Sequence, residues 1–275
     1  MHIDAHQHFW KFDPVKDAWI TDDMQIIRRD FLPDNLKPLL VENNIGGCVA
    51  VQADQSEIET DFLIQLAIEN NFIKGVVGWI DLRAANVEER LEHYRQFDIV
   101  KGFRHILQGE AQRDMMLHQD FKNGIAALQS FNFTYDILIL PDQLSFVKQL
   151  VAFFSEQKFV IDHLAKPYIK FKKIDGWKNA IKQIAQHENV YCKLSGMATE
   201  ADWQHWQKED LKPYIDVVVD AFGVNRILFG SDWPVCLLAA DYKKTVDIVK
   251  DYFSSFSIDE QSKVFGQNAV EFYNL

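Results

Sequence analysis

Two histidines separated by one residue open the chain, and an aspartate follows an apolar run near its other end. His6 and His8 lie in the run Ile3–Phe9, and Asp232 ends the run Arg226–Asp232. Side chains alternate along a strand, so both imidazoles point to the same side. The first and last strands of a closed barrel are neighbours, which predicts that Asp232 meets the two histidines. Such a group can bind a divalent metal or a polarised substrate oxygen.

Polar or ionisable residues stand at the end of every short apolar run in the chain. They are His8, Gln52, Asp81, His105, Asp136, His163, Ser195 and Asp232. The carboxyl ends of the strands carry the active site in barrels of parallel strands, so we interpret this set as a ring of functional groups. The alternative for His163 is a buried histidine with satisfied hydrogen bonds. The alternative for His105, beside Arg104, is a structural ion pair.

The apolar runs alternate with longer amphipathic stretches. The runs are Ile3–Phe9, Gly47–Gln52, Ile73–Ile80, Ile99–His105, Asn132–Leu138, Lys158–Leu164, Val190–Leu194 and Arg226–Asp232. Helical patterns lie at Leu36–Asn43, Ser56–Asn70, Val87–Phe97, His118–Ser130, Asp142–Glu156, Gly176–His187, Lys208–Phe222, Asp241–Tyr252 and Asp259–Phe272. This alternation predicts an α/β fold, a (β/α)8 TIM barrel that forms a single domain over residues 1–275. An open doubly wound sheet is the competitor, but no glycine-rich phosphate loop follows the first run.

A long connection from Trp10 to Pro33 follows the first apolar run without clear periodicity. It contains Trp10, Phe12 and Trp19, which argue against disorder. Long loops in compact domains are usually functional or disordered. We therefore interpret this connection as a wall of the site or a lid.

Composition excludes several classes of partner. The net charge is -11, with 29 Lys and Arg against 40 Asp and Glu. A nucleic-acid phosphate backbone or an anionic membrane surface would require clusters of basic residues, and none is present. No apolar run approaches the roughly 18 residues that span a bilayer. We expect no nucleic-acid or membrane partner, and the sequence leaves a homo-oligomer open.

Cysteine usage favours a reducing compartment. Cys48, Cys192 and Cys236 are odd in number, widely spaced and outside any C-x-x-C motif. No basic segment followed by an apolar stretch precedes His6, as a signal peptide would require. We expect a cytoplasmic protein.

Several local strings together resemble the amidohydrolase superfamily, and most closely its amidohydrolase-2 branch of sugar lactonases. They are Asp4-Ala5-His6-Gln7-His8-Phe9-Trp10, Val51-Gln52-Ala53, Val77-Gly78-Trp79-Ile80-Asp81-Leu82, Lys101-Gly102-Phe103-Arg104-His105, Asp162-His163-Leu164-Ala165-Lys166-Pro167 and Gly230-Ser231-Asp232-Trp233-Pro234. The similarity to L-fuconolactonase and L-rhamnonolactonase types covers nearly the whole chain. It implies a TIM barrel that opens a sugar lactone.

The chain departs from the two-metal pattern of many amidohydrolases. The fifth run, Phe133–Leu138, contains no histidine, and Lys101 precedes Gly102 at the wrong end of the fourth. A binuclear site is therefore not expected. His6, His8, His163 and Asp232 can instead hold one divalent ion such as Zn²⁺. The resemblance also implies metal-independent relatives, and neutral imidazoles serve as ligands or as hydrogen-bond donors at the same spacing.

The expected reaction is hydrolysis of an L-fucono-, L-rhamnono- or L-galactono-lactone to the aldonic acid. Asp232 is the expected general base, and a metal held by His6, His8 and His163, or donors such as His163 and Arg104, would stabilise the oxyanion. The expected contacts to the sugar are Trp10, Gln52, Arg104, His105, Lys193 and Trp233. For the aromatic residues the alternative is packing at the barrel mouth.

Other functions stay open at this point. One is a metal-dependent decarboxylase of a small aromatic acid, which the wider branch also contains. Another is a non-catalytic barrel that binds a sugar acid, because a fold alone never proves turnover. A TatD-like metallonuclease is weaker still, because the net charge and the missing histidine in the fifth run argue against it.

Overall fold

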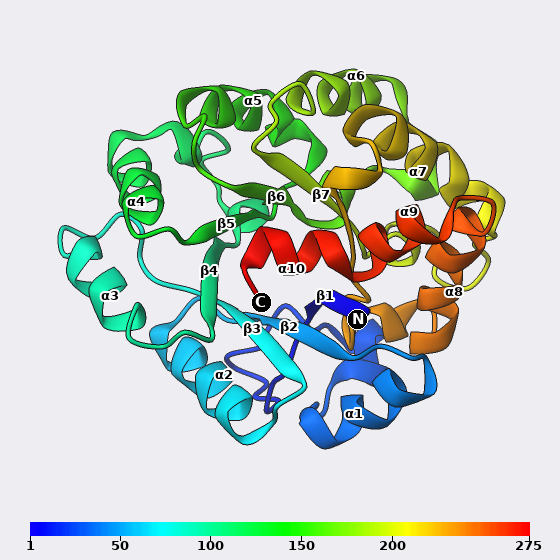
Figure 1. Cartoon of the computed structure of the whole chain (residues 1–275), viewed down its shortest axis with the longest axis horizontal. Helices are drawn as coiled ribbons and strands as arrows, with labels where there is room; N and C mark the ends of the chain where they lie inside the picture. The colour runs from blue at the N-terminus through cyan, green and yellow to red at the C-terminus, as the bar shows by residue number, and fades with distance from the viewer.

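Eight parallel strands in chain order form the centre of the molecule. The computed structural model describes residues 1–275. The strands are β1 Ile3–Gln7, β2 Gly47–Val51, β3 Ile73–Gly78, β4 Val100–His105, β5 Thr134–Ile137, β6 Phe159–Ile161, β7 Val190–Leu194 and β8 Ile227–Phe229. Each strand pairs with the next along the chain (Figure 1). The predicted TIM barrel and the order of its strands are confirmed.

Two backbone hydrogen bonds close the barrel between its first and last strands. His8 N donates to Trp233 O at 2.7 Å, and Asp232 N donates to His6 O at 2.8 Å. Gln7 and Trp233 form an isolated parallel bridge at the same place. These contacts lie just beyond the end of β8, so closure of the barrel brings Asp232 directly beside β1.

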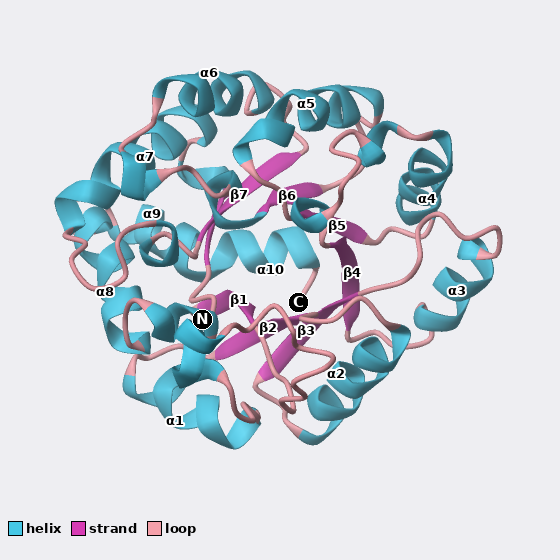
Figure 2. Ribbon diagram, turned by 180° about the vertical axis from the view of Figure 1, so that it is seen from behind, coloured by secondary structure: helices cyan, strands magenta, loops and turns pink.

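Helices surround the barrel, and the last of them lies across its end (Figure 2). They are α1 Pro33–Glu42, α2 Glu57–Glu69, α3 Val87–Tyr94, α4 Gln119–Ser130, α5 Leu144–Phe153, α6 Asp175–Ile184, α7 Lys208–Phe222, α8 Tyr242–Phe253, α9 Ile258–Ser262 and α10 Asn268–Tyr273. Ser56 and Asp241 cap α2 and α8 with side-chain oxygens. The stretch expected as one helix over Asp259–Phe272 is divided by a π-helical turn at Lys263–Gln267. No helix combines the length and apolar character needed to cross a membrane.

Most strands are shorter than the predicted runs, and β6 and β8 end earliest relative to prediction. β6 ends at Ile161 and β8 ends at Phe229, whereas the predicted runs continue to Leu164 and Asp232. His163 and Asp232 have φ of 51° and 58°, a left-handed conformation that a strand excludes. Apolar runs mark buried backbone, but they do not distinguish a strand from the turn that follows it.

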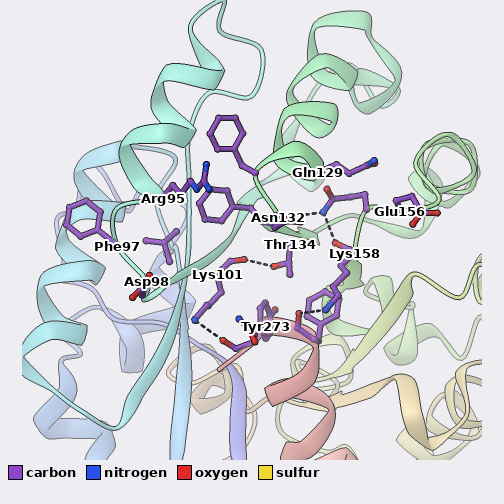
Figure 3. Close-up of a pocket in the computed structure, with 16 residues that line it drawn as sticks. Arg95, Phe97, Asp98, Lys101, Gln129, Asn132, Thr134, Glu156, Lys158 and Tyr273 are labelled. Atoms are coloured by element: carbon purple, nitrogen blue, oxygen red, sulfur yellow. Dashed lines mark hydrogen bonds between the residues drawn. The ribbon is translucent and has the colours of Figure 1, made fainter.

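The C-terminal helix α10 lies across the end of the barrel at which the strands begin (Figure 1). Lys101 Nζ donates to Asn274 O at 2.8 Å, and Lys158 Nζ donates to Glu271 O at 3.2 Å. A cleft of about 600 Å³ opens beside these contacts and is lined by Tyr273 among others (Figure 3). Lys101 therefore anchors α10 at the end of the barrel away from His8, in line with its predicted absence from the site.

The connection after β1 is ordered against the barrel by Trp10. Trp10 and Phe31 exchange backbone hydrogen bonds at 3.0 and 2.9 Å, and Trp10 packs edge-on against Trp19. Lys16 in the same connection lies 3.8 Å from the carboxylate of Glu59 in α2. The connection therefore forms a wall beside His8, whose ring centroid is 6.5 Å from that of Trp10.

Glu59 makes stability depend on pH. Burial raises its pKa from the ordinary 4.5 to about 7, although the Ala53 N–H and Lys16 oppose the shift. A carboxyl with a raised pKa in the folded state stabilises the protein below its unfolded pKa, and this contribution is lost as pH rises through the folded value. We expect Glu59→Gln to raise the free energy of unfolding by about 1–3 kcal/mol at pH 8 and by little at pH 4.5.

Urea denaturation at the two pH values measures this effect. Glu69→Gln is the matched control, because Glu69 is exposed on the same helix. Equal gains for Glu59→Gln at both pH values would contradict the assigned cause.

Candidate active site

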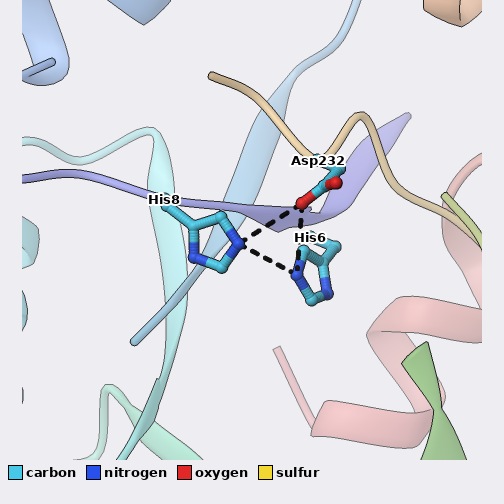
Figure 4. Close-up of side chains that lie close together, drawn as sticks. All are labelled: His6, His8 and Asp232. Atoms are coloured by element: carbon cyan, nitrogen blue, oxygen red, sulfur yellow. Dashed lines mark hydrogen bonds and ion pairs between the residues drawn. The ribbon is translucent and has the colours of Figure 1, made fainter. Parts of the chain in front are cut away.

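Three side chains from β1 and from the turn after β8 converge at the carboxyl end of the barrel. His6 Nε2 and His8 Nε2 are 3.2 Å apart. Asp232 Oδ1 lies 3.8 Å from His6 Nε2 and 3.4 Å from His8 Nε2 (Figure 4). All three side chains are buried. The predicted meeting of the two histidines with Asp232 is thus found in the structure.

His163 completes the group from the turn after β6. Its Nε2 lies 3.8 Å from Asp232 Oδ1, and its ring centroid is 4.4 Å from that of His6. Its Nδ1 is 2.8 Å from Ser195 Oγ. A Cβ at Gly196, where φ is 60°, would lie 2.7 Å from the same Nδ1, so only glycine leaves room for the ring.

A left-handed turn places His163. Residues His163, Leu164, Ala165 and Lys166 have φ of 51°, 55°, 58° and 48°. Left-handed backbone costs roughly 1–2 kcal/mol per residue outside glycine. Trp177 Nε1 donates to Leu164 O at 2.7 Å and offsets part of this cost. Four consecutive strained residues at one strand end indicate a functional constraint on where His163 lies.

Hydrogen bonds on the far sides of the rings orient the group. His8 Nδ1 lies 2.7 Å from Val51 O, a pure acceptor, so the His8 proton is on Nδ1 and Nε2 offers its lone pair to the centre. Asp4 accepts hydrogen bonds from His6 N at 3.2 Å and from Ser231 N at 2.8 Å. Asp4 thereby joins β1 to the segment that carries Asp232. Its position in a strand that is buried throughout was the available signal for this unpredicted role.

A layer of buried charges lies next to His6. Arg104 Nη1 is 3.3 Å from His6 Nε2 and donates to Asp162 Oδ2 at 3.0 Å. Asp162 Oδ1 and Lys193 Nζ lie 3.2 and 3.0 Å from His6 Nδ1. Lys193 Nζ also donates to Asp136 Oδ2 at 2.5 Å. Two cations thus face two carboxylates, so this layer is neutral when His6 is neutral.

Burial and charge set the ionisation of the central group. Burial opposes ionisation of Asp232, but the imidazoles of His163, His8 and His6, which gain charge at low pH, outweigh it and hold the pKa of Asp232 below the usual range. Burial lowers the pKa of His163 to about 4 and that of His6 well below its usual value. At neutral pH an ionised Asp232 therefore faces neutral His6 and His163. Its ion-pair partners are the three histidines, with no lysine or arginine among them.

The donor set fits one divalent metal ion. Ligands at 2.0–2.1 Å from a tetrahedral Zn²⁺ are separated by about 3.3 Å. The three separations among His6 Nε2, His8 Nε2 and Asp232 Oδ1 are 3.2, 3.4 and 3.8 Å. A cation here would also balance the carboxylate of Asp232. These three donors form the close group, and His163 Nε2 lies 3.8 Å from Asp232 Oδ1 beside it.

The residues expected to contact a sugar lie in different environments. Trp10 and Trp233 both pack against Phe31, with ring centroids 5.6 and 5.2 Å away, and are almost fully buried. Gln52 Nε2 donates to Arg104 O at 3.1 Å, and Arg104 Nη2 donates to Gln52 O. Their contact with a substrate stays a prediction, and packing at the barrel mouth is what the structure shows for both tryptophans.

His105 lies apart from the central group. Its Nε2 is 2.8 Å from Glu110 Oε1, and its Nδ1 accepts from Trp79 Nε1 at 3.4 Å. Burial lowers its pKa although Glu110 favours the charged form. The anticipated alternative of a structural pair thus has a partner, Glu110, which the sequence analysis did not single out.

Comparison with known proteins agrees with this geometry. The family model described as Amidohydrolase matches residues 3–275. The chain is 39% identical to an L-fucono-1,5-lactonase from Burkholderia multivorans, over 100% of this chain and 96% of that protein. It is 26% identical to an L-rhamnono-gamma-lactonase from Scheffersomyces stipitis, over 96% and 86%. A crystal structure of a Burkholderia multivorans amidohydrolase with bound Zn has a TM-score of 0.96, 39% identity and coverage of 100% and 99%.

Proposed function

Because this chain belongs to the amidohydrolase family, we propose that it hydrolyses a sugar lactone to the open aldonic acid. The observation that supports this proposal is the convergence of Asp232 with His6, His8 and His163 at the carboxyl end of the barrel. The relatives named as L-fucono-1,5-lactonase and L-rhamnono-gamma-lactonase support this class of substrate. We propose an L-fucono-lactone as the first substrate to test.

Asp232 acts as the general base in this proposal. Its ionised carboxylate accepts the proton of the attacking water and returns it to the ring oxygen when the lactone opens. Such help is worth roughly 10² to 10⁴ in rate. A carboxylate with a lowered pKa is a weak base, so the reaction needs either an activated ester or a water molecule with a lowered pKa. A lactone is an activated ester.

In the metal-free form of the proposal, the oxyanion forms beside His163 and Arg104, which provide N–H donors. One good donor is worth about 3 kcal/mol. His6, His8, Asp232 and His163 would hold one Zn²⁺, which when bound polarises the carbonyl and lowers the pKa of water to about 7. The relative crystallised with bound Zn supports this assignment. The neutral histidines offer lone pairs without first losing a proton.

A pH-indicator assay on a panel of sugar lactones tests the proposal. The panel contains L-fucono-, L-rhamnono- and L-galactono-lactones, and acid release is followed at neutral pH. We expect saturable turnover with the highest kcat/KM for one of these three. If the protein binds the aldonic acid but turns over no lactone, the remaining function is that of a non-catalytic barrel that binds a sugar acid. Release of CO₂ from a small aromatic acid would favour the decarboxylase.

Removal of the metal tests the second part of the proposal. We expect one equivalent of Zn²⁺ per chain, and a fall in kcat of at least about tenfold after chelation that added Zn²⁺ reverses. Metal content by mass spectrometry is measured on the same samples. Full activity in protein shown to contain no metal would assign the oxyanion to Arg104 and His163 alone.

A further inference from the structure

Lys193 in β7 is completely buried next to His6. Three polar atoms lie close to its Nζ: Asp136 Oδ2 at 2.5 Å, Asp162 Oδ1 at 3.0 Å and His6 Nδ1 at 3.0 Å. The contacts with Asp136 and His6 have hydrogen-bond geometry, so Lys193 is directed at His6. Its expected contact with a sugar hydroxyl stays a prediction.

Tyr273 connects this cluster to the opposite end of the barrel. Its hydroxyl lies 3.0 and 2.8 Å from the two carboxylate oxygens of Asp136, to which it donates. Tyr273 is the last residue of α10, which Lys101 and Lys158 anchor through backbone carbonyls (Figure 3). A continuous series of buried contacts therefore runs from the C-terminal helix through Asp136 to His6.

We propose that Tyr273, Asp136 and Lys193 form a positioning relay that fixes the ring of His6. Lys193 Nζ lies 3.0 Å from His6 Nδ1, and Arg104 Nη1 lies 3.3 Å from His6 Nε2, so one cation stands beside each ring nitrogen. The relay holds the first of these contacts and thereby the direction in which His6 Nε2 faces His8 Nε2 at 3.2 Å.

The relay also prepares His6 for a metal. A ligand nitrogen Nε2 requires the proton on Nδ1, with an acceptor beside it. Asp162 Oδ1 lies 3.2 Å from Nδ1, on a carboxylate that also pairs with Lys193 and Arg104. Asp162 therefore offers that acceptor, and Lys193 Nζ, 3.0 Å from Asp162 Oδ1, pairs with the carboxylate. Asp136 holds Lys193 between the two carboxylates, so loss of its charge would let Lys193 move toward Asp162 and away from His6.

Two substitutions and a matched control test the relay by kinetics. This test rests on the proposed lactonase activity. We expect kcat to fall about three- to tenfold in Tyr273→Phe and about ten- to a hundredfold in Asp136→Asn, with KM within about twofold of wild type. Tyr94→Phe is the control. The Tyr94 hydroxyl also donates to carboxylates, Glu57 at 3.1 Å and Asp61 at 3.2 Å, but on helices outside the barrel. Tyr94→Phe should lose comparable stability and keep kcat.

Nitrogen NMR of the metal-free protein labelled in its histidines tests the relay independently of turnover. His6 is assigned by its loss in His6→Asn. We expect a shift of the His6 nitrogen signals in Asp136→Asn and Tyr273→Phe but not in Tyr94→Phe. Unchanged His6 signals in both relay variants would overturn the relay. If wild type opens no lactone, the proposed function fails while these spectra still decide the relay. If Asp136→Asn does not fold, the His6 signals of Tyr273→Phe decide the relay by the same criterion.

Discussion

Replacing Asp232 by asparagine should lower turnover of the lactone about a thousandfold, within the range of roughly 10² to 10⁴ for general acid–base catalysis. The amide keeps the shape of the side chain but cannot accept the proton of water. Asp232 has a φ of 58°, a left-handed conformation that asparagine also adopts readily. The segment after β8 should therefore keep its backbone, and the loss should appear in kcat. Steady-state kinetics with the best lactone of the panel provide the measurement.

Asp81→Asn is the control for this experiment. Asp81 belongs to the predicted ring of polar strand ends, but in the structure it is exposed after β3, unlike Asp232, and its side chain accepts only from Arg83 N. Its replacement should change kcat less than twofold, by analogy with other exposed positions. Asp232→Asn with wild-type kcat would remove this residue from the role of base. A fall in kcat no larger than the fall caused by chelation, together with lost Zn²⁺ binding, would restrict Asp232 to holding the metal.

Gly230→Ala should reduce kcat about a hundredfold by displacing His6. A Cβ at Gly230 would lie 2.6 Å from His6 Cβ and 3.2 Å from His6 N. Neither neighbour can move away easily, because both belong to the β1 backbone or to the first side-chain atom beyond it. A displacement of about 1 Å at a catalytic group costs about 10²-fold in rate. Kinetics of the folded variant, together with its thermal unfolding, measure the two consequences.

Gly176→Ala provides the comparison. Gly176 lies in the first turn of α6, and an added Cβ would meet nothing within 4 Å. Alanine in a helix is favoured over glycine by about 0.5–1 kcal/mol, so this variant should gain slight stability at full activity. Full activity in Gly230→Ala would show that the barrel tolerates a shift of His6. It would weaken the geometric account of the site.

Much of the site was predictable because the topology of a barrel relates distant parts of the chain. Alternating runs predicted eight strands, and closure then required Asp232 to meet His6 and His8. Helix limits were also close, since Ser56 and Asp241 are strong caps at the sequence level. The strand ends were less predictable, as the early ends of β6 and β8 show. There the backbone adopts left-handed turns around His163 and Asp232. The neighbours of these residues are apolar and buried, so the sequence pattern does not mark where the strand ends and the turn begins.

The amino-acid sequence by itself determined the order of the strands and the end of the barrel that carries chemistry, because hydrophobic period and residue type are local properties. Only the tertiary structure decided the partners of the buried charges. Lys193 meets Asp136 and His6, which lie 57 and 187 residues away along the chain. Such pairs depend on the stagger of strands around the barrel and on a helix end reaching in from the far side. No local pattern encodes either of them.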